Sequence, residues 1–194
     1  SFWGMSKLKK LDLGNNPTLE CVFLKNVDVE DDTIFENLNE INVSKCKNLR
    51  VIDIEQAGEK FTELDLSSND KLNSLGLEGL RGLKQLKMPE TDNLKEIVVK
   101  ETALESLALE KYTKLDKVCV GGNQFDTLKI NMEQKTEKDI ENMYLLFDNN
   151  LKVEFISSKN GIVPNIKRLD NHNLWAGIVF SNYVVTDYEI PECW

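Results

Sequence analysis

The chain has 194 residues, of which 41% are hydrophobic, so it can bury a sizeable core as one domain. Its formal net charge of −9, from 33 acidic and 24 basic residues, argues against nucleic acid and anionic membranes as partners. No run of about 18 apolar residues occurs, and we therefore expect no membrane insertion.

One spacing of mostly apolar residues is repeated from Leu8 onward. Counted from the first residue of a copy as zero, it marks offsets 3, 5, 8, 11, 14 and 16. After the longer first copy, successive copies start 21–23 residues apart. Five full copies begin at Leu8, Leu38, Phe61, Leu83 and Leu104, and a sixth that begins at Phe125 stops after Ile130.

The repeated spacing predicts two short strands in each turn. Offsets 3 and 5, and again 14 and 16, are apolar pairs separated by one residue, so both members point to the same side of an extended segment. We call these segments the first and the second strand of a turn. One turn cannot bury its inward residues alone, whereas stacked turns bury them between neighbours. At offset 8 an Asn such as Asn69 can bond the backbone of the next turn, and we expect Cys46 to be a small buried substitute.

A period of roughly 20–29 residues with L-x-x-L-x-L spacing is typical of the leucine-rich repeat. Over about residues 8–132 the chain resembles that family, and more narrowly the short-repeat bacterial surface proteins of the internalin and Bacteroidetes type. Their pattern reads like FTELDLSSNDKLNSLGL, from Phe61 to Leu77. We therefore expect a leucine-rich repeat solenoid of stacked short parallel β-strands with little helix. It would span residues 1–132 in about five and a half turns, followed by a small α+β cap over 133–194.

Two features at the start of the chain have more than one interpretation. Trp3 precedes Leu8 by five residues, as Val99 precedes Leu104, so residues 1–7 are either the last strand of a preceding turn or a short tail. The extra length of the first turn falls in an acidic insertion, residues 27–37. Its acidic residues could suggest a calcium site, but the spacing and the central glycine of an EF-hand are missing. We therefore expect a solvated loop, with a short helix that has Asp32 or Thr33 as its N-cap as the alternative.

The resemblance also indicates which strand faces a ligand. The family signature L-x-x-L-x-L-x-x-N-x-L fits the second strand best, and Leu115–Phe125 matches it at every position. The outward residues of the second strands are less polar than those of the first, and an exposed apolar array favours contact with a partner. The alternative is that a neighbouring loop or the C-terminal segment covers them. The candidate partner-binding residues are Cys21, Phe23, Val51, Asp53, Ser74, Gly76, Glu96, Val98, Lys117 and Cys119.

The C-terminal third departs from the repeat. Thr136 and Asp139 form an approximate capping box, and apolar residues then follow at helical spacing, so we expect a capping helix over about 136–147. Strands should follow, one of them in the alternating stretch 151–157 and others in the apolar stretch 174–185. The last segment holds Trp175, Tyr183, Tyr188 and Trp194, which either pack against the cap or form a carbohydrate platform.

Catalysis finds little support in the sequence. The single histidine, His172, lies in an Asp/Asn-rich turn, and no nucleophile elbow, zinc-protease, P-loop or dinucleotide motif occurs. The four cysteines lie far apart, with no C-x-x-C, which excludes a zinc site by spacing and gives no disulfide framework. We expect no enzyme activity, no cofactor and no metal.

We therefore predict a non-catalytic binding module that acts in protein–protein interaction or adhesion. Its partner would be a protein, with a glycan as the alternative, and the chain itself would be a monomer. The family resemblance alone places it outside the cell or on a bacterial cell surface. Two alternatives stay open: carbohydrate binding through the aromatic C-terminal segment, and a structural spacer in a longer repeat array.

Overall fold

The computed structural model describes residues 7–24, 35–156 and 164–169. Its largest element is a parallel sheet of seven strands, which we call the main sheet. In spatial order it consists of β13 (Ile166–Leu169), β11 (Tyr144–Asp148), β9 (Lys117–Gly121), β8 (Glu96–Lys100), β6 (Ser74–Glu78), β4 (Val51–Glu55) and β2 (Cys21–Leu24). These are the predicted second strands, continued past the predicted end of the repeat.

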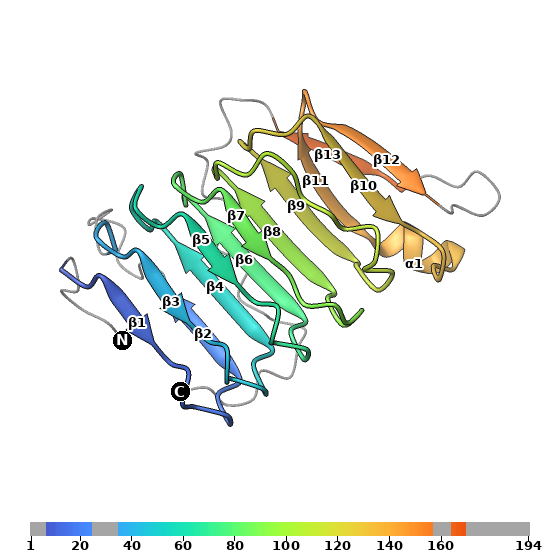
Figure 1. Ribbon diagram of the computed structural model, residues 1–194. Coiled ribbons are helices and arrows are strands. Elements are labelled where there is room, and N and C mark those ends of the chain that lie inside the picture. Colours follow the sequence, from blue (N-terminus) through green and yellow to red (C-terminus); the bar gives the residue numbers. More distant parts are fainter. Residues whose placement is uncertain (1–6, 25–34, 157–163, 170–194) are drawn as a thin grey trace.

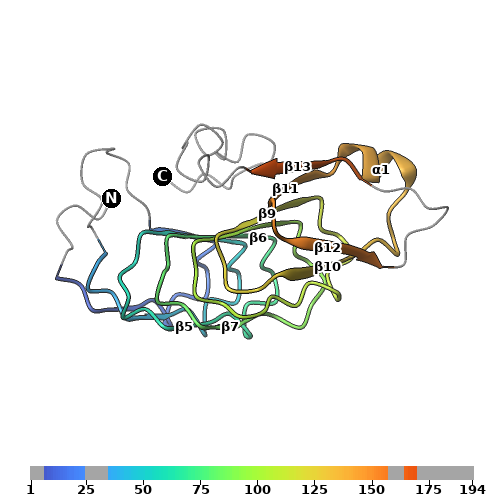
Figure 2. The same cartoon turned by 90° about the horizontal axis from the view of Figure 1, so that it is seen from above.

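The first strands form a second layer on the other side of the core. They pair as three parallel two-stranded sheets, so this layer is less continuous than the main sheet. The pairs are β1 (Lys10–Asp12) with β3 (Glu40–Asn42), β5 (Glu63–Asp65) with β7 (Gln85–Lys87), and β10 (Thr127–Asn131) with β12 (Lys152–Ile156). Figures 1 and 2 show the two layers wound as one coil. The expected leucine-rich repeat solenoid is confirmed.

The core lies between the two layers and follows the predicted register. Ile52 pairs with Leu75, Leu75 with Ile97, and Ile97 with Val118, so the offset-14 residues form one inward column. All four side chains are at most 1% exposed. Each turn thus buries its apolar residues against the next turn, which is how a solenoid gains stability.

The offset-8 position ties neighbouring turns together through their backbones, as predicted. Asn69 is fully buried, and its Nδ2 donates to the carbonyl oxygens of Val43 and Cys46, each at 3.0 Å. Cys46, the expected small substitute, is also fully buried, and its Sγ donates to the Leu13 carbonyl oxygen at 3.1 Å. Burial raises the pKa of the Cys46 thiol, so it stays protonated.

The chain leaves each second strand through a tight corner. The residue directly after β4, β6, β8 or β9 has a positive φ, namely Gln56, Gly79, Glu101 and Gly122. Glycine suits this left-handed backbone because it lacks a Cβ. At Gly58 the reason for glycine is a close approach, since an added Cβ would lie 1.7 Å from the Glu36 carbonyl oxygen. The corners of adjacent turns therefore stack in backbone contact.

The predicted capping helix is shorter than expected. Helix α1 spans Glu137–Asn142, and the predicted capping box is present, with Thr136 and Asp139 bonded in both directions. The expectation of helix up to residue 147 was wrong, because residues 144–148 form β11. The reason is pairing: Leu145 and Phe147 take the inward positions beside Val118 and Val120 of β9. A strand here covers the open edge of β9, which a helix would leave unpaired.

The main sheet therefore continues past residue 132. The strand expected in 151–157 is confirmed as β12, which pairs with β10. The other C-terminal expectations, on the stretch 174–185, on His172 and on the four aromatic residues, lie outside the described residues. So do most of the insertion 27–37 and residues 1–6. Within the described ranges, no helix is long and apolar enough to cross a bilayer.

Candidate functional site: the outer face of the main sheet

The structure brings all ten candidate residues together on one face. They occupy β2, β4, β6, β8 and β9, and strand pairing aligns them in two columns. Because side chains alternate along a strand, these residues point away from the core while their neighbours point into it. The columns are Cys21, Val51, Ser74, Glu96 and Lys117, and Phe23, Asp53, Gly76, Val98 and Cys119.

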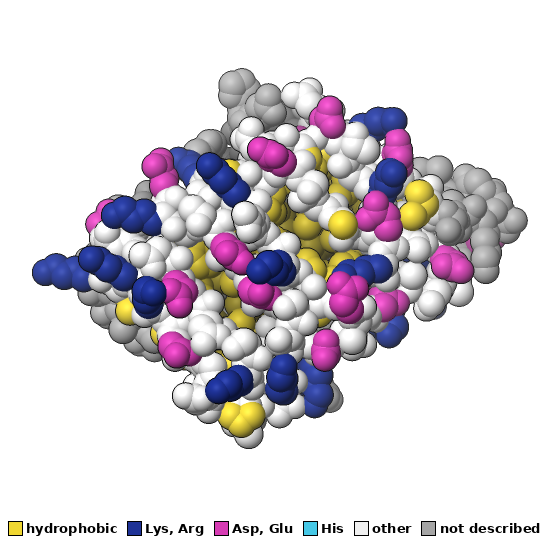
Figure 3. Space-filling view, in the orientation of Figure 1, with side chains coloured by type: hydrophobic (Ala, Val, Ile, Leu, Met, Phe, Trp, Pro, Cys, Tyr) yellow, Lys and Arg dark blue, Asp and Glu magenta, His cyan; other side chains and the backbone are white. Residues whose placement is uncertain are grey.

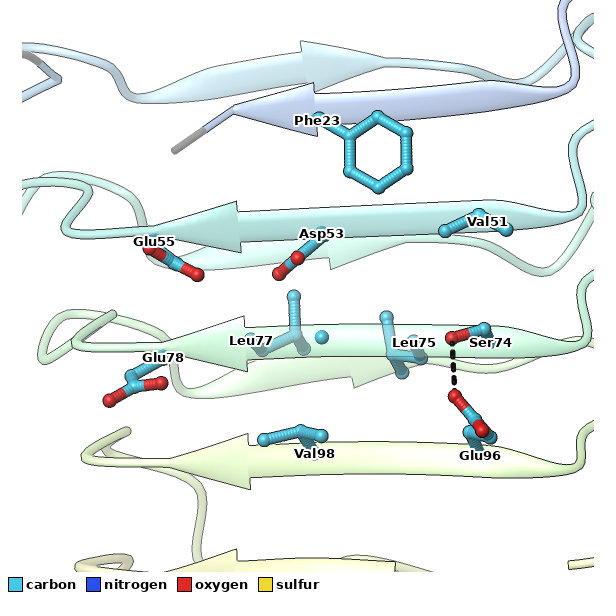
Figure 4. Close-up of a pocket in the computed structure, with 11 residues that line it drawn as sticks. Phe23, Val51, Asp53, Glu55, Ser74, Leu75, Leu77, Glu78, Glu96 and Val98 are labelled. Atoms are coloured by element: carbon cyan, nitrogen blue, oxygen red, sulfur yellow. Dashed lines mark hydrogen bonds between the residues drawn. The ribbon is translucent and has the colours of Figure 1, made fainter. Parts of the chain in front are cut away.

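A hollow lies on this face over strands β2, β4, β6 and β8. The hollow is open to solvent, and its volume together with the open space above it is about 460 Å³. Its lining residues are Phe23, Val51, Asp53, Glu55, Ser74, Leu75, Gly76, Leu77, Glu78, Glu96 and Val98. Figure 4 shows the ring of Phe23 extending from β2 toward β4, between Val51 and Asp53.

Gly76 lets the Asp53 side chain lie close to the sheet. It lies on β6, between Asp53 of β4 and Val98 of β8. A Cβ added at Gly76 would lie 2.4 Å from Asp53 Oδ1, so even an alanine would displace that carboxylate. The missing side chain of Gly76 thus leaves room that the Asp53 carboxylate occupies.

The rim of the hollow is acidic. Glu55 and Glu78 are paired in register at one end, and Glu96 lies at the other end, where it accepts a hydrogen bond from Ser74 Oγ at 3.4 Å. Two basic residues lie on the side of β8 and β9. Lys117 approaches Glu96 at 3.8 Å, and Lys100 is the register partner of Glu78. Neither basic residue lines the hollow.

The outer face is not uniformly exposed. The residues on β2, β4 and β6 are partly exposed, as expected for a contact surface. Val98 and Cys119, however, are 6% and 0% exposed, which differs from the expectation that both are accessible. Cys119 lies between the bulkier side chains of Val98 and Leu146, its register partners on both sides. The accessible part of the predicted array is therefore its N-terminal half, around the hollow.

Lys100 is a further buried residue on this side. It is 2% exposed, and desolvation lowers the pKa of its ammonium group, while the charge of Glu78 works in the opposite direction.

Sequence reasoning missed Glu55 and Glu78 as lining residues. They lie two residues after Asp53 and Gly76, so they continue the same outward alternation by one more step. Strand length is the missing signal: β4 and β6 have five residues rather than the three that the repeat marks.

The opposite face, formed by the first strands, compensates most of its own charges. Lys87 Nζ lies 2.8 Å from a Glu63 oxygen and 3.3 Å from an Asp65 oxygen, and Lys10 pairs with Glu40. Positive and negative side chains are interspersed over this side of the molecule (Figure 3). Such exposed pairs contribute little stability each, but they leave no large field of one sign.

Several polar residues of the opposite face also serve the corners. Asp12, Asn42 and Asp65 each accept a hydrogen bond from the backbone N–H two residues on, which closes the turn after the strand. A local structural role thus explains these polar residues of the opposite face. Within the described ranges, no group of three or more potential ligands could hold a metal ion.

Comparison with known proteins finds a likeness to solved structures only. No protein-family model matches the chain, and no curated protein matches it. Among solved structures, it is similar to the functional domain of InlJ from Listeria monocytogenes, which includes a cysteine ladder, at 15% sequence identity and a TM-score of 0.42. The match covers 74% of this chain and 45% of the InlJ chain, so the chain spans less than half the length of that protein.

Proposed function

We propose that this chain is a non-catalytic binding module that holds another protein on the outer face of its main sheet. The observation that carries the proposal is the hollow over Gly76, with its partly exposed apolar walls and acidic rim. Such a module would act in interaction or adhesion by a secreted or surface-attached bacterial protein.

The main sheet suits this role because it is a stiff platform. Each of its inner strands pairs in parallel with two neighbours, and the inward side chains are fully packed. A surface of this kind loses little conformational entropy when it binds, so a small number of apolar anchors can supply most of the affinity. Phe23 and Val51 are the accessible apolar side chains at the hollow, and they are the expected contacts.

A capture experiment with matched variants tests the proposal. Host extracellular-matrix and mucin extracts are passed over the immobilised wild-type chain, over Phe23→Lys/Val51→Lys, and over Gln85→Lys/Ser106→Lys. The last variant adds the same two charges at exposed first-strand positions on the opposite face. Each captured protein is then purified, and its dissociation constant is measured with all three chains.

We expect a protein partner whose affinity falls at least about tenfold, a loss of about 1.4 kcal/mol, in the first variant only. Equal affinity for all three chains would refute the outer face as the site. Capture of polysaccharide alone would favour the carbohydrate alternative, and no specific capture would favour the spacer.

A further inference from the structure

Backbone pairing between the first strands of neighbouring turns is present at some junctions and missing at others. β1 pairs with β3, and β5 pairs with β7. β3 and β5 are also neighbours in the coil (Figure 1), but they belong to different sheets. The next first-strand segment after β7, residues 105–109, forms no strand. Over the first four junctions, paired and unpaired first strands therefore alternate.

The two paired junctions share one backbone hydrogen bond. In each of them, the N–H at offset 5 donates to the carbonyl oxygen at offset 4 of the next turn. Leu13 donates to the Asn42 carbonyl oxygen at 2.9 Å. Leu66 donates to the Lys87 carbonyl oxygen at 2.8 Å. Such a bond requires that the two strands approach to about 4.7–4.9 Å.

At the other two junctions this bond is missing from the described residues. The equivalent donors are the N–H groups of Val43 and Met88, and neither has a backbone acceptor in the next turn. Side chains join these turns instead. Asn69 Nδ2 donates to the Val43 carbonyl oxygen at 3.0 Å, and the Tyr112 hydroxyl donates to the Pro89 carbonyl oxygen at 2.7 Å.

The residue at offset 8 differs between the two kinds of junction. Cys46 and Thr91, at the paired junctions, have short side chains that reach only one atom beyond Cβ. Asn69 and Tyr112, at the unpaired junctions, reach further, and both are fully buried. Protein interiors are close-packed, so a long side chain enclosed between two turns sets a minimum distance between them.

The fifth junction agrees with this relation, although its bridge comes from another position. Asn131 Nδ2 donates to the Glu110 carbonyl oxygen at 2.8 Å, so a long side chain again joins two turns. Strand β10, which contains Asn131, pairs with β12 and not with residues 105–109. Among the described residues, long bridging side chains thus coincide with unpaired first strands at each of these junctions.

We propose that the reach of the bridging side chain selects between two forms of junction. A short side chain lets the first strands of adjacent turns pair through their backbones, which we call a closed junction. A long side chain holds the first strands apart and supplies the hydrogen bond itself, which we call an open junction. The main sheet is paired at both kinds. The coil can therefore bend about the main sheet at the junctions of Asn69 and Tyr112 without breaking a backbone hydrogen bond. This property does not depend on where a partner binds.

Amide hydrogen exchange of the full chain, followed by NMR, measures which junctions are closed. The exchange rate of an amide reports how readily its hydrogen bond opens. Val43 and Leu66 both occupy offset 5, the first at an open junction and the second at a closed one. In the wild-type chain, the amide of Leu66 should exchange at least about tenfold more slowly than that of Val43, relative to their intrinsic rates.

Two variants exchange the two forms of junction, and a third is their control. Asn69→Thr shortens the bridge and should slow the exchange of the Val43 amide at least about tenfold. Thr91→Asn lengthens the bridge and should accelerate the exchange of the Leu66 amide at least about tenfold, relative to the amides of β6. Thr91→Ser replaces one short side chain by another and should leave the Leu66 amide unchanged.

Slower exchange in Asn69→Thr would be decisive, because a merely destabilised chain exchanges faster at its amides. If Asn69→Thr does not fold, Thr91→Asn with its serine control decides. The proposal is overturned if Val43 and Leu66 exchange alike in the wild-type chain, if the folded variants leave their amides unchanged, or if Thr91→Ser acts like Thr91→Asn.

Discussion

The stability of this solenoid should depend on where along the coil an inward side chain is removed. Leu64 and Leu11 occupy the same inward position of the first strand in different turns, but Leu64 is 1% exposed while Leu11 is partly exposed. Leu64→Ala removes three carbons, a transfer term of about 2.4 kcal/mol at about 0.8 kcal/mol for each. The turns on both sides hold the cavity open, so the total cost should be about 3–5 kcal/mol. Leu11→Ala should cost about 1–2 kcal/mol, because part of that surface already meets water.

Urea denaturation followed by far-UV circular dichroism measures both changes. The midpoint should fall much further for Leu64→Ala than for Leu11→Ala, with similar slopes if unfolding stays cooperative. Equal costs for the two variants would refute the assignment of Leu64 to an interior turn. A cost below about 0.5 kcal/mol for Leu64→Ala, which is typical of surface positions, would refute the repeat register itself.

Three further changes test the contacts between turns. Gly58→Ala should destabilise the fold by about 1–3 kcal/mol in thermal melts, because its Cβ would meet a backbone carbonyl at 1.7 Å that cannot rotate away. Asn69→Ala should lower the free energy of unfolding, measured in urea, by about 2–4 kcal/mol, since two buried carbonyl groups lose their donor. Asn16 occupies the equivalent position but is exposed, so Asn16→Ala should change the free energy of unfolding by no more than about 0.5 kcal/mol. Tyr112 is fully buried and donates to the Pro89 carbonyl oxygen at 2.7 Å, so Tyr112→Phe should cost about 1–2 kcal/mol near neutral pH. Burial raises the pKa of Tyr112 above its ordinary value of about 10. The protonated tyrosine therefore stabilises the fold fully below about pH 10, and this contribution is lost as the pH rises further. Tyr112→Phe should abolish the loss of stability that ionisation of Tyr112 causes at alkaline pH.

Most of the fold could be predicted because the repeat fixes several properties at once. A single register determines which residues point inward, which strands are neighbours and which residues align across them. The column Phe23, Asp53, Gly76, Val98 and Cys119 was therefore predictable as a set, and strand pairing reproduces it at every step. Whether this set contacts a partner stays a prediction, since alignment alone does not establish binding.

The prediction failed where a local pattern fits two structures. Between residues 136 and 148, apolar residues at helical spacing include Ile140 and Phe147, while Leu145 and Phe147 also have the spacing of a strand. The open edge of β9 decides between them, because only a strand can bond its backbone groups. The strand β9 precedes β11 by more than 20 residues in the sequence. The pattern of residues 136–148 alone therefore contains no information about that edge and could not predict the strand.

The hollow was less predictable than the face that contains it. It is lined by Gly76, by carboxylates of β4 and β6 and by the ring of Phe23, which come from three different turns. The exposure of Val98 and Cys119 was also misjudged, because an outward position in a sheet does not by itself determine how much of a side chain its neighbours cover.

The two outer faces differ in a way that bears on function. The inward side chains supply most of the stability of the solenoid, so outward residues can be exchanged with little loss of stability unless they make local contacts that the fold needs. Outward residues of the first-strand face make such contacts, since Asp12, Asn42 and Asp65 close corners and Lys87 bridges two carboxylates. At the hollow, by contrast, Glu55 is the register partner of Glu78, and Lys100 is the next partner of Glu78 on the other side. What distinguishes the hollow is its partly exposed apolar side chains, Phe23 and Val51, and they are the reason why we propose that the partner binds this face.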